Sequence, residues 1–151
     1  MAYMPWLYFA AKPDVRAWAV PWQRALHASL MALEHVFIHE DAFIAPSARL
    51  FAEPSRPIHV HARASIAAEC FVHGPVELGE DASLNPRVSV DGGRAGVRIG
   101  RDTRIATGTS IFAFDHGLAP DALVRTQKTR SRGIDIGADV WIGANAGVTD
   151  G

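Results

Sequence analysis

The sequence predicts an all-β fold, a parallel β-helix of hexapeptide repeats with a helical cap at its N-terminal end. An aliphatic residue stands at every sixth position through long stretches of the chain. A small or β-branched residue, such as Ala64, Cys70 or Thr103, follows most of them four places later, so two positions in each six face one interior. A period of six belongs neither to a helix nor to an ordinary strand. It is typical of a solenoid whose coil has three flat sides of one hexapeptide each.

The aliphatic positions define about five coils within residues 36–151. They are Ile38, Ile44, Leu50, Val60, Ile66, Val72, Leu78, Leu84, Val90, Ile99, Ile105, Ile111, Ile136, Ile142 and Val148. Gly79, Asn85, Gly100, Gly137 and Gly143 each follow such a residue, and we expect them to supply the positive φ of tight corners. By this count the chain stops at Gly151 in the middle of a coil, so we expect the β-helix domain to be truncated in its last coil.

Residues 1–35 form a separate capping segment in this prediction. Apolar residues recur there at helical spacing, as Trp18, Trp22, Leu26, Leu30 and Leu33. Because a proline is tolerated in the first turn of a helix, we expect a short turn after Pro13 and a main amphipathic helix from Pro21 to about Glu34. The apolar stripe of this helix would cover the unpaired edge of the first coil.

The hexapeptide pattern is interrupted at 54–57, at 92–96 and, at greatest length, at 117–133. Insertions in a solenoid are forced outward at its corners, because the coils must keep their register to stack. We therefore expect residues 117–133 to form a protruding loop. Loops of this length inside compact repeats are often functional.

Composition excludes several classes of partner. The net charge is −1 with a pI near 6.6, so no global basic field would attract nucleic acid. No stretch approaches the roughly 18 uninterrupted apolar residues of a membrane span. The N-terminus lacks the basic region of a signal peptide, and we expect a cytoplasmic location. The single cysteine, Cys70, falls on an inward position, where a thiol acts as a small apolar group.

Two segments, IGRDTRIATGTSIFAFDHG and IDIGADVWIGANAGVTDG, resemble the hexapeptide-repeat acyltransferases, specifically sugar O-acetyltransferases of the maltose and galactoside acetyltransferase type. The resemblance covers roughly residues 60–151. It implies a left-handed coil and a homotrimer. Each β-helix of the trimer has the shape of a three-sided prism, and the active sites lie between neighbouring prisms. It also implies acetyl-CoA as the co-substrate, a hydroxyl of a sugar or glycan as the acceptor, and no metal.

The resemblance assigns roles to six residues. The histidine that ends a coil before the protruding loop matches His116, the general base. On the substrate side, the family's asparagine matches Asn85 in LNPRVSV, and its acidic residue matches Asp91 more loosely. The acyl-CoA positions match Trp141, Gly143 and Ala144.

The chemistry supports a histidine independently of the resemblance. Moving an acyl group from a thioester to a hydroxyl needs a base of near-neutral pKa, and histidine has one. Backbone N–H groups at a corner could stabilise the tetrahedral oxyanion. Asp115 is an unpromising partner for His116, because adjacent residues of a strand point to opposite faces.

Each assignment has a purely structural alternative. His116 would then be a solvated loop residue, Asn85 a corner residue and Trp141 an aromatic side chain that packs between subunits. The basic residues of the loop would meet the phosphates of CoA or merely face solvent; they are Arg125, Lys128, Arg130 and Arg132.

Two alternatives concern the whole protein. One is a non-catalytic β-helix that acts as a scaffold. The other is a zinc site like that of γ-class carbonic anhydrases, built from His59, His61 and His73. Zinc needs three protein ligands that converge on one point. The order of these three histidines differs from that family's set, so we expect no metal.

Overall fold

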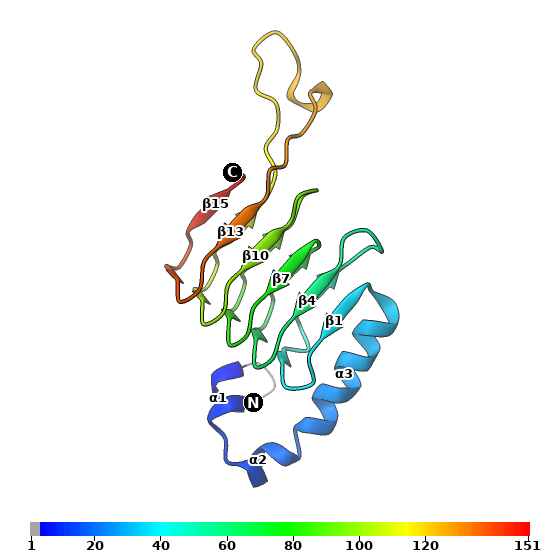
Figure 1. Ribbon diagram of the computed structural model, residues 1–151, viewed down its shortest axis with the longest axis vertical. Helices are drawn as coiled ribbons and strands as arrows, with labels where there is room; N and C mark the ends of the chain where they lie inside the picture. Colours follow the sequence, from blue (N-terminus) through cyan, green and yellow to red (C-terminus); the bar gives the residue numbers. More distant parts are fainter. Residues whose placement is uncertain (1–3) are drawn as a thin grey trace.

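The computed structural model describes residues 4–151; residues 1–3 of the expected cap lie outside the described part. The chain forms three five-stranded parallel sheets, with three helices at the N-terminal end (Figure 1). The first sheet contains β1 (Val36–Ile38), β4 (Ile58–Val60), β7 (Val76–Leu78), β10 (Val97–Ile99) and β13 (Ile134–Ile136). The second contains β2 (Phe43–Ile44), β5 (Ser65–Ile66), β8 (Ser83–Leu84), β11 (Arg104–Ile105) and β14 (Trp141–Ile142). The third contains β3 (Arg49–Phe51), β6 (Phe71–His73), β9 (Ser89–Asp91), β12 (Ser110–Phe112) and β15 (Gly147–Thr149).

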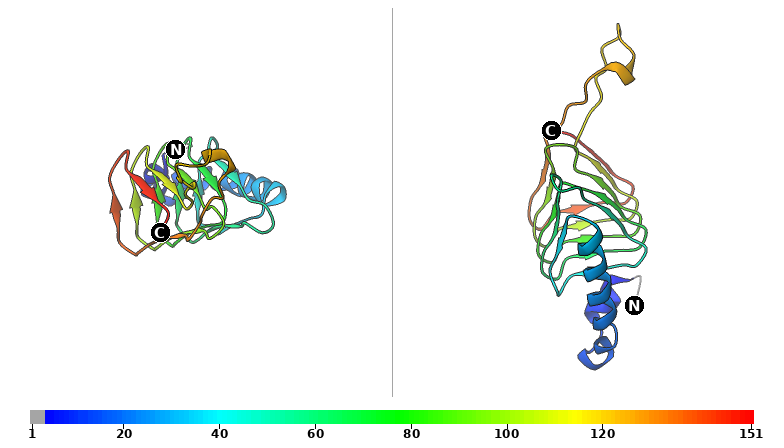
Figure 2. Two further views of the ribbon diagram at one scale, coloured as in Figure 1. Left: turned by 90° about the horizontal axis from the view of Figure 1, so that it is seen from above. Right: turned by 90° about the vertical axis from the view of Figure 1, so that its right-hand side faces the viewer.

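This architecture confirms the predicted β-helix. Each coil contributes one strand to every sheet, and Figure 2 shows the five coils stacked along one axis. The fifth coil, which the spacing counts as unfinished, carries β13, β14 and β15. These strands pair with β10, β11 and β12 of the coil before. Residues 117–133 project as a long loop from the fourth turn (Figure 1).

The period of six in the sequence corresponds to the register of the sheets, because aliphatic residues of successive coils pair with one another. In the first sheet Ile38 pairs with Val60, Val60 with Leu78, and so on to Ile136. The aliphatic residues of the other two sheets form equivalent columns. A further inward column, which the count by six did not include, lines the first sheet as Val36, Ile58, Val76, Val97 and Ile134. The core is therefore a stack of aliphatic layers.

The expected positions of positive φ were wrong. Left-handed residues lie three places after the inward aliphatic residue, not directly after it. At the corners they are Arg63, Glu69, Asp81, Arg87, Gly93, Asp102, Gly108, Asp139, Asn145 and Gly151. None of the five residues expected there, Asn85 included, has positive φ. Each four-residue corner thus turns the chain from one sheet to the next at its third residue.

Close approach between coils explains the corner glycines instead. A Cβ on Gly79 would lie 2.7 Å from the backbone nitrogen of Arg101 in the next coil. A Cβ on Gly100 would lie 2.5 Å from the carbonyl carbon of Gly137. Backbone atoms cannot move aside as the end of a side chain can, so these positions exclude larger residues.

The helices are α1 (Pro5–Ala10), α2 (Pro13–Ala17) and α3 (Val20–Leu33). The main helix agrees with the prediction: Pro21 stands in its first turn, and Glu34 is its C-terminal cap. The prediction for its apolar stripe was partly wrong. Leu26 and Leu30 pack against the core of the β-helix. Three other residues of the expected stripe face solvent: Trp18, Trp22 and Leu33 are 57%, 70% and 78% exposed.

A polar contact closes the open edge of the first coil. The side-chain amide of Gln23 donates to the carbonyl oxygen of Ile44 and accepts from its N–H, both at 2.9 Å. The carboxylate of Glu34 accepts from the N–H of Ala52 at 2.7 Å. These side chains take the place of a preceding coil. Gln23 is one of two buried residues of α3; the other is His27.

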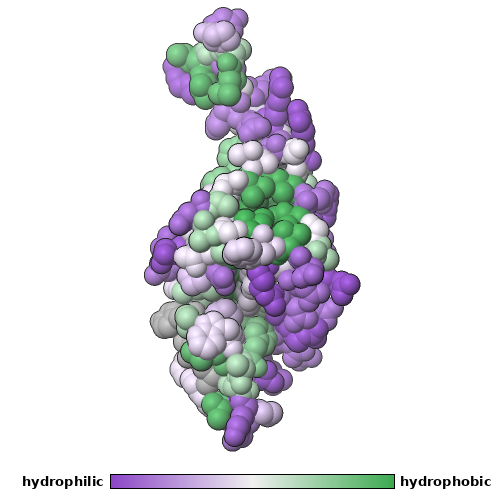
Figure 3. Space-filling model, turned by 90° about the vertical axis from the view of Figure 1, so that its left-hand side faces the viewer, coloured by the Kyte–Doolittle hydropathy of each residue, from purple (hydrophilic) through white to green (hydrophobic). Residues whose placement is uncertain are grey.

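The opposite end of the prism is more open. Ile136, Ile142 and Val148 of the fifth coil are half-buried. Figure 3 shows an apolar patch, bordered by polar surface, in the middle of this end. Within residues 4–151, no helix has the length and apolar character needed to cross a bilayer.

Gly100→Ala should lower the free energy of unfolding by about 1–3 kcal/mol, because the new methyl group overlaps the backbone of Gly137. Gly147→Ala is the matched control, since a Cβ there meets no atom within 4 Å. Urea unfolding of both variants measures the difference. Equal stabilities would contradict the argument from coil spacing.

Stability should fall below neutral pH through His27. This side chain is 3% exposed, its Nε2 has no hydrogen-bond partner among the described residues, and burial lowers its pKa. The unfolded state therefore takes up the proton first, and stability is lost as the pH falls below about 6.5. His27→Leu should remove a slope of up to about 1.4 kcal/mol per pH unit. Urea unfolding between pH 7.5 and 5 measures the slope, and a slope in His27→Leu equal to that of the wild type would contradict the argument.

Candidate functional site

The protruding loop leaves the prism at the corner between the third and first sheets. Beyond β12 its two arms pair as an antiparallel bridge, in which Asp115 and Arg130 exchange backbone hydrogen bonds of 2.9 Å. Farther out, the side chain of Gln127 bonds to backbone groups of Ala119 and Ala122 at 2.9–3.0 Å. A 3-10 turn, η1 (Val124–Thr126), lies beside it. The loop is thus held by its own hydrogen bonds.

Ser131 fixes the root of the loop to the coil beneath. Its hydroxyl donates to the carbonyl of Ala113 at 2.6 Å. The same oxygen accepts from the N–H groups of Arg94 and Ala95 at 2.9 and 3.0 Å. One side chain therefore joins both arms of the loop to the insertion at 92–96.

His116 lines a cavity of about 570 Å³ at this root. The other lining residues are Asp115, Gly117, Leu118, Ala119, Gln127, Arg130, Arg132 and Asp150. The imidazole is exposed, and the ring of Phe114 meets it edge-on at 6.0 Å. Among the described residues, no hydrogen bond joins it to Asp115 or to another carboxylate. A neutral imidazole here can accept a proton from a bound molecule.

Asp91 lies at the same corner of the prism but in a different set of contacts. It ends β9 and pairs in register with Phe112, so it lies one coil below the loop. Its carboxylate meets His73 Nδ1 at 3.2 Å and Arg56 at 3.4 Å, and accepts from the N–H of Gly93 at 2.9 Å. These contacts hold Asp91 before any substrate arrives.

The expected cofactor residues lie at another corner of the chain. Gly143 and Ala144 belong to the turn between β14 and β15, and Trp141 begins β14 with 78% of its surface exposed. Asn85 occupies the equivalent turn two coils earlier, where its carbonyl oxygen accepts from the thiol of Cys70 at 3.1 Å. Within one chain, the structure therefore does not bring these four residues to His116.

The three histidines of the zinc alternative are held apart by different partners. His59 stacks on Phe37 with ring centroids 4.7 Å apart. His61 bonds to Glu77 at 2.9 Å. His73 lies between two carboxylates: Asp91 faces its Nδ1, and Glu53 faces its Nε2 at 3.4 Å. Among residues 4–151, no three His, Cys, Asp or Glu side chains converge as metal ligands would.

In the described part of the chain, His73, unlike His116, has a carboxylate partner, Asp91, that could orient its ring. However, His73 does not line the cavity at the root of the loop. Both of its ring nitrogens already face carboxylates. His116, by contrast, faces open volume. Of these two histidines, His116 is therefore the one that a bound molecule can reach.

The sequence did not single out Gln127 or Asp150 as residues of this site. The carboxylate of Asp150 accepts from the backbone N–H groups of Arg132 and Gly133 at 2.8 Å, so the end of the fifth coil forms part of the cavity. No local pattern signals this contact, because it joins segments that only the coil brings together.

Comparison with known proteins supports the fold. Neither a protein-family model nor a curated protein matches the sequence. Among solved structures, the chain is similar to a mutant of AntD, an N-acyltransferase from Bacillus cereus, in complex with dTDP and coenzyme A. The TM-score is 0.65 at 16% identity, over 82% of this chain and 68% of that chain.

Two further structures are similar. Another AntD mutant, in complex with dTDP-4-amino-4,6-dideoxyglucose and coenzyme A, has a TM-score of 0.59 at 13% identity, over 83% of this chain and 69% of that chain. A mutant of perosamine N-acetyltransferase from Caulobacter crescentus, with CoA and GDP-perosamine, has a TM-score of 0.44 at 18% identity, over 85% of this chain and 59% of that chain. At these identities the likeness to the two AntD structures is one of fold. The maltose acetyltransferase type stays a prediction from the sequence motifs.

Ser131→Ala should loosen the root of the loop, because the amides of Arg94 and Ala95 lose their acceptor. A lost hydrogen bond of about 1 kcal/mol corresponds to roughly fivefold faster amide exchange at these two positions. Hydrogen exchange read by NMR or mass spectrometry measures the change. Thr129→Val is the control, since its hydroxyl has no hydrogen bond among the described residues. Exchange that stays at the wild-type rate in Ser131→Ala would show that the hydroxyl does not hold the root.

Proposed function

We propose that the protein is an acyl-CoA-dependent acyltransferase that acetylates a sugar or glycan hydroxyl, with His116 as the general base. The observation that carries the proposal is an exposed imidazole, free of carboxylate partners among the described residues, that lines a 570 Å³ cavity at the root of the loop. The motif resemblance around this histidine points to the same role. The β-helix fold shared with a CoA-bound N-acyltransferase supports it.

The reaction would proceed by direct transfer. The imidazole nitrogen takes the proton of the sugar hydroxyl while the oxygen attacks the thioester carbon, and a tetrahedral oxyanion forms. Backbone N–H groups at a corner stabilise the negative charge. The intermediate collapses, the C–S bond breaks, and the imidazolium returns its proton to the departing thiolate. The products are an O-acetyl ester and CoA, with no covalent enzyme intermediate.

The site would be completed by a second copy of the chain. His116 lies at the corner between the third and first sheets, whereas Trp141 lies in β14 and Gly143 and Ala144 lie in the turn between the second and third sheets. These two places cannot face each other within one chain. They can face each other when two copies stand side by side, with His116 from one copy and the β14 end of the site from its neighbour. The resemblance implies a homotrimer, and we propose that in it one copy contributes the base and its neighbour binds acetyl-CoA. Asn85 and Asp91 would contact the acceptor, and the reaction would take place in the cytoplasm.

A second candidate is transfer to an amino group. The AntD structures favour it, because AntD is an N-acyltransferase and one of the two holds an amino sugar linked to dTDP. The same imidazole would then remove a proton from the attacking amine.

His116→Ala should lower kcat/KM by about 10²- to 10⁴-fold, the usual contribution of a general base. CoA release is measured with acetyl-CoA and a panel of hydroxyl and amino sugars, both free and nucleotide-linked. His61→Ala is the control, since it removes an exposed histidine outside the cavity. Unchanged turnover in His116→Ala would reject the assigned role. If acetyl-CoA gives neither turnover nor a rise in melting temperature, the scaffold alternative is favoured.

A further inference from the structure

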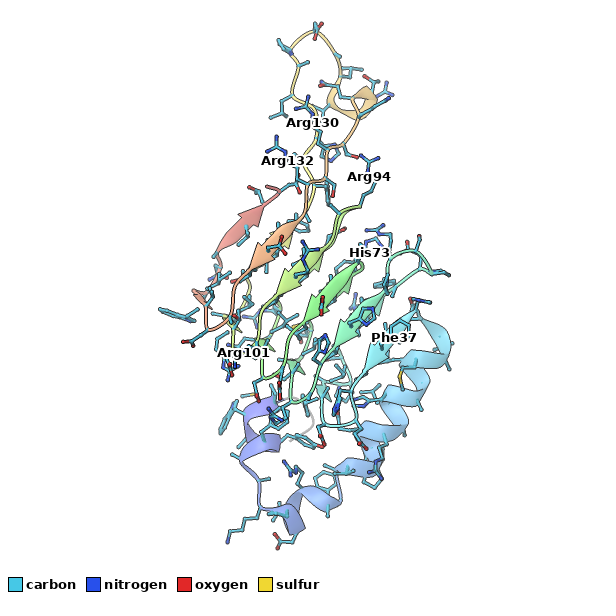
Figure 4. All side chains as sticks on the ribbon, viewed as in Figure 1. Phe37, His73, Arg94, Arg101, Arg130 and Arg132 are labelled. Carbon is cyan, nitrogen blue, oxygen red and sulfur yellow. The ribbon has the colours of Figure 1, made fainter. Side chains whose placement is uncertain are left out.

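Two arginines of the loop root have positive charges that the described chain does not neutralise. Other arginines, such as Arg63 and Arg98, form ion pairs with carboxylates of neighbouring coils. Within residues 4–151, the guanidinium groups of Arg130 and Arg132 form no ion pair and no hydrogen bond. Figure 4 shows both at the base of the loop, above the strands of the prism.

Both arginines line the cavity that contains His116. They stand two places apart on the arm that returns from the loop, so this cavity brings two positive charges together. Two like charges side by side repel each other, and a bound anion removes that repulsion.

The acidic residues of the cavity do not fill this role. Asp150 directs both carboxylate oxygens to the backbone N–H groups of the returning arm rather than to a guanidinium group. Asp115 stands opposite Arg130 in the backbone bridge, yet no ion pair joins their side chains. The loop as a whole adds to the positive field: residues 117–133 hold four basic residues and one acidic residue, in a chain of net charge −1.

We propose that Arg130 and Arg132 form a subsite for the phosphate or diphosphate group of a substrate bound beside His116. The proposal rests on the proposed function for its setting, because it names the chemistry that the cavity recognises. Guanidinium groups present paired N–H donors that match phosphate oxygens, and such charge-assisted bonds are about twice as strong as neutral ones. Two sources would supply this chemistry: the phosphates of CoA, or the diphosphate of a nucleotide-linked sugar.

The first test measures binding without turnover. Inorganic pyrophosphate is titrated into the full chain by calorimetry at low salt. Arg130→Ala and Arg132→Ala should each weaken binding about tenfold, as loss of a charge-assisted contact implies. Arg125→Ala is the matched control: it removes the same charge from the same loop at a residue that does not line the cavity. It should change the affinity less than twofold. His116→Ala should still bind pyrophosphate, so failure of the catalytic role leaves this result readable.

The second test identifies the source. CoA is compared with pantetheine, which lacks the phosphates, and uridine diphosphate with uridine. Weaker binding of CoA alone in the two variants assigns the subsite to the acyl donor. Weaker binding of uridine diphosphate alone assigns it to the acceptor.

Three outcomes would overturn the proposal. In the first, both variants bind pyrophosphate as the wild type does. In the second, Arg125→Ala loses as much affinity as they do, which would mean unspecific attraction by the loop. In the third, the two variants change the oligomeric state and leave anion binding unchanged. The arginines would then contact a neighbouring chain. Unchanged melting temperatures and Arg132→Lys, which keeps the charge, guard against loss of folding.

Discussion

Every feature of this protein depends on the register between successive coils. Each strand pairs in parallel with the strand one coil earlier, so equivalent residues stack directly over one another. A shift of one residue would turn an aliphatic column outward and expose it to water. The chain is therefore free to vary only at the corners. The insertions, and with them the chemistry, are confined to these places.

The same constraint explains why the three corners of the β-helix differ in the residues they carry. Where three consecutive coils carry glycine after the first-sheet strand, backbones approach so closely that no Cβ fits between them. At the corner after the third sheet, insertions push the chain outward. Polar side chains collect there: Glu53, Arg56, His73 and Asp91 bond to one another across three coils, and His116 stands beyond them on the loop. A prism of uniform coils has no cavity at this corner; the long loop makes one.

The two ends of the prism differ in what covers them. At the N-terminal end, the amide of Gln23 pairs with a strand edge as a peptide group of a preceding coil would. A hydrogen-bonding cap satisfies the open N–H and C=O groups, which an apolar cap would leave unpaired. The tryptophans expected to do this work remain exposed instead. At the other end, half-buried aliphatic residues of the fifth coil mark the last layer of the described core (Figure 3).

The sequence by itself determined the fold class, the inward columns, the main helix and the place of the loop, because each follows from a local period or its interruption. The count by six found the fifteen aliphatic residues from Ile38 to Val148 that stack as three columns, but it missed the second inward column of the first sheet, from Val36 to Ile134. Only the tertiary structure decided which residues meet. Ser131 bonds to Ala95, and the carboxylate of Asp150 bonds to the backbone beneath the loop. Trp141, by contrast, lies away from His116. These relations depend on the number of residues in each coil, which sets where each residue falls around the axis. Contacts of this kind join residues distant in sequence and leave no periodic trace in it.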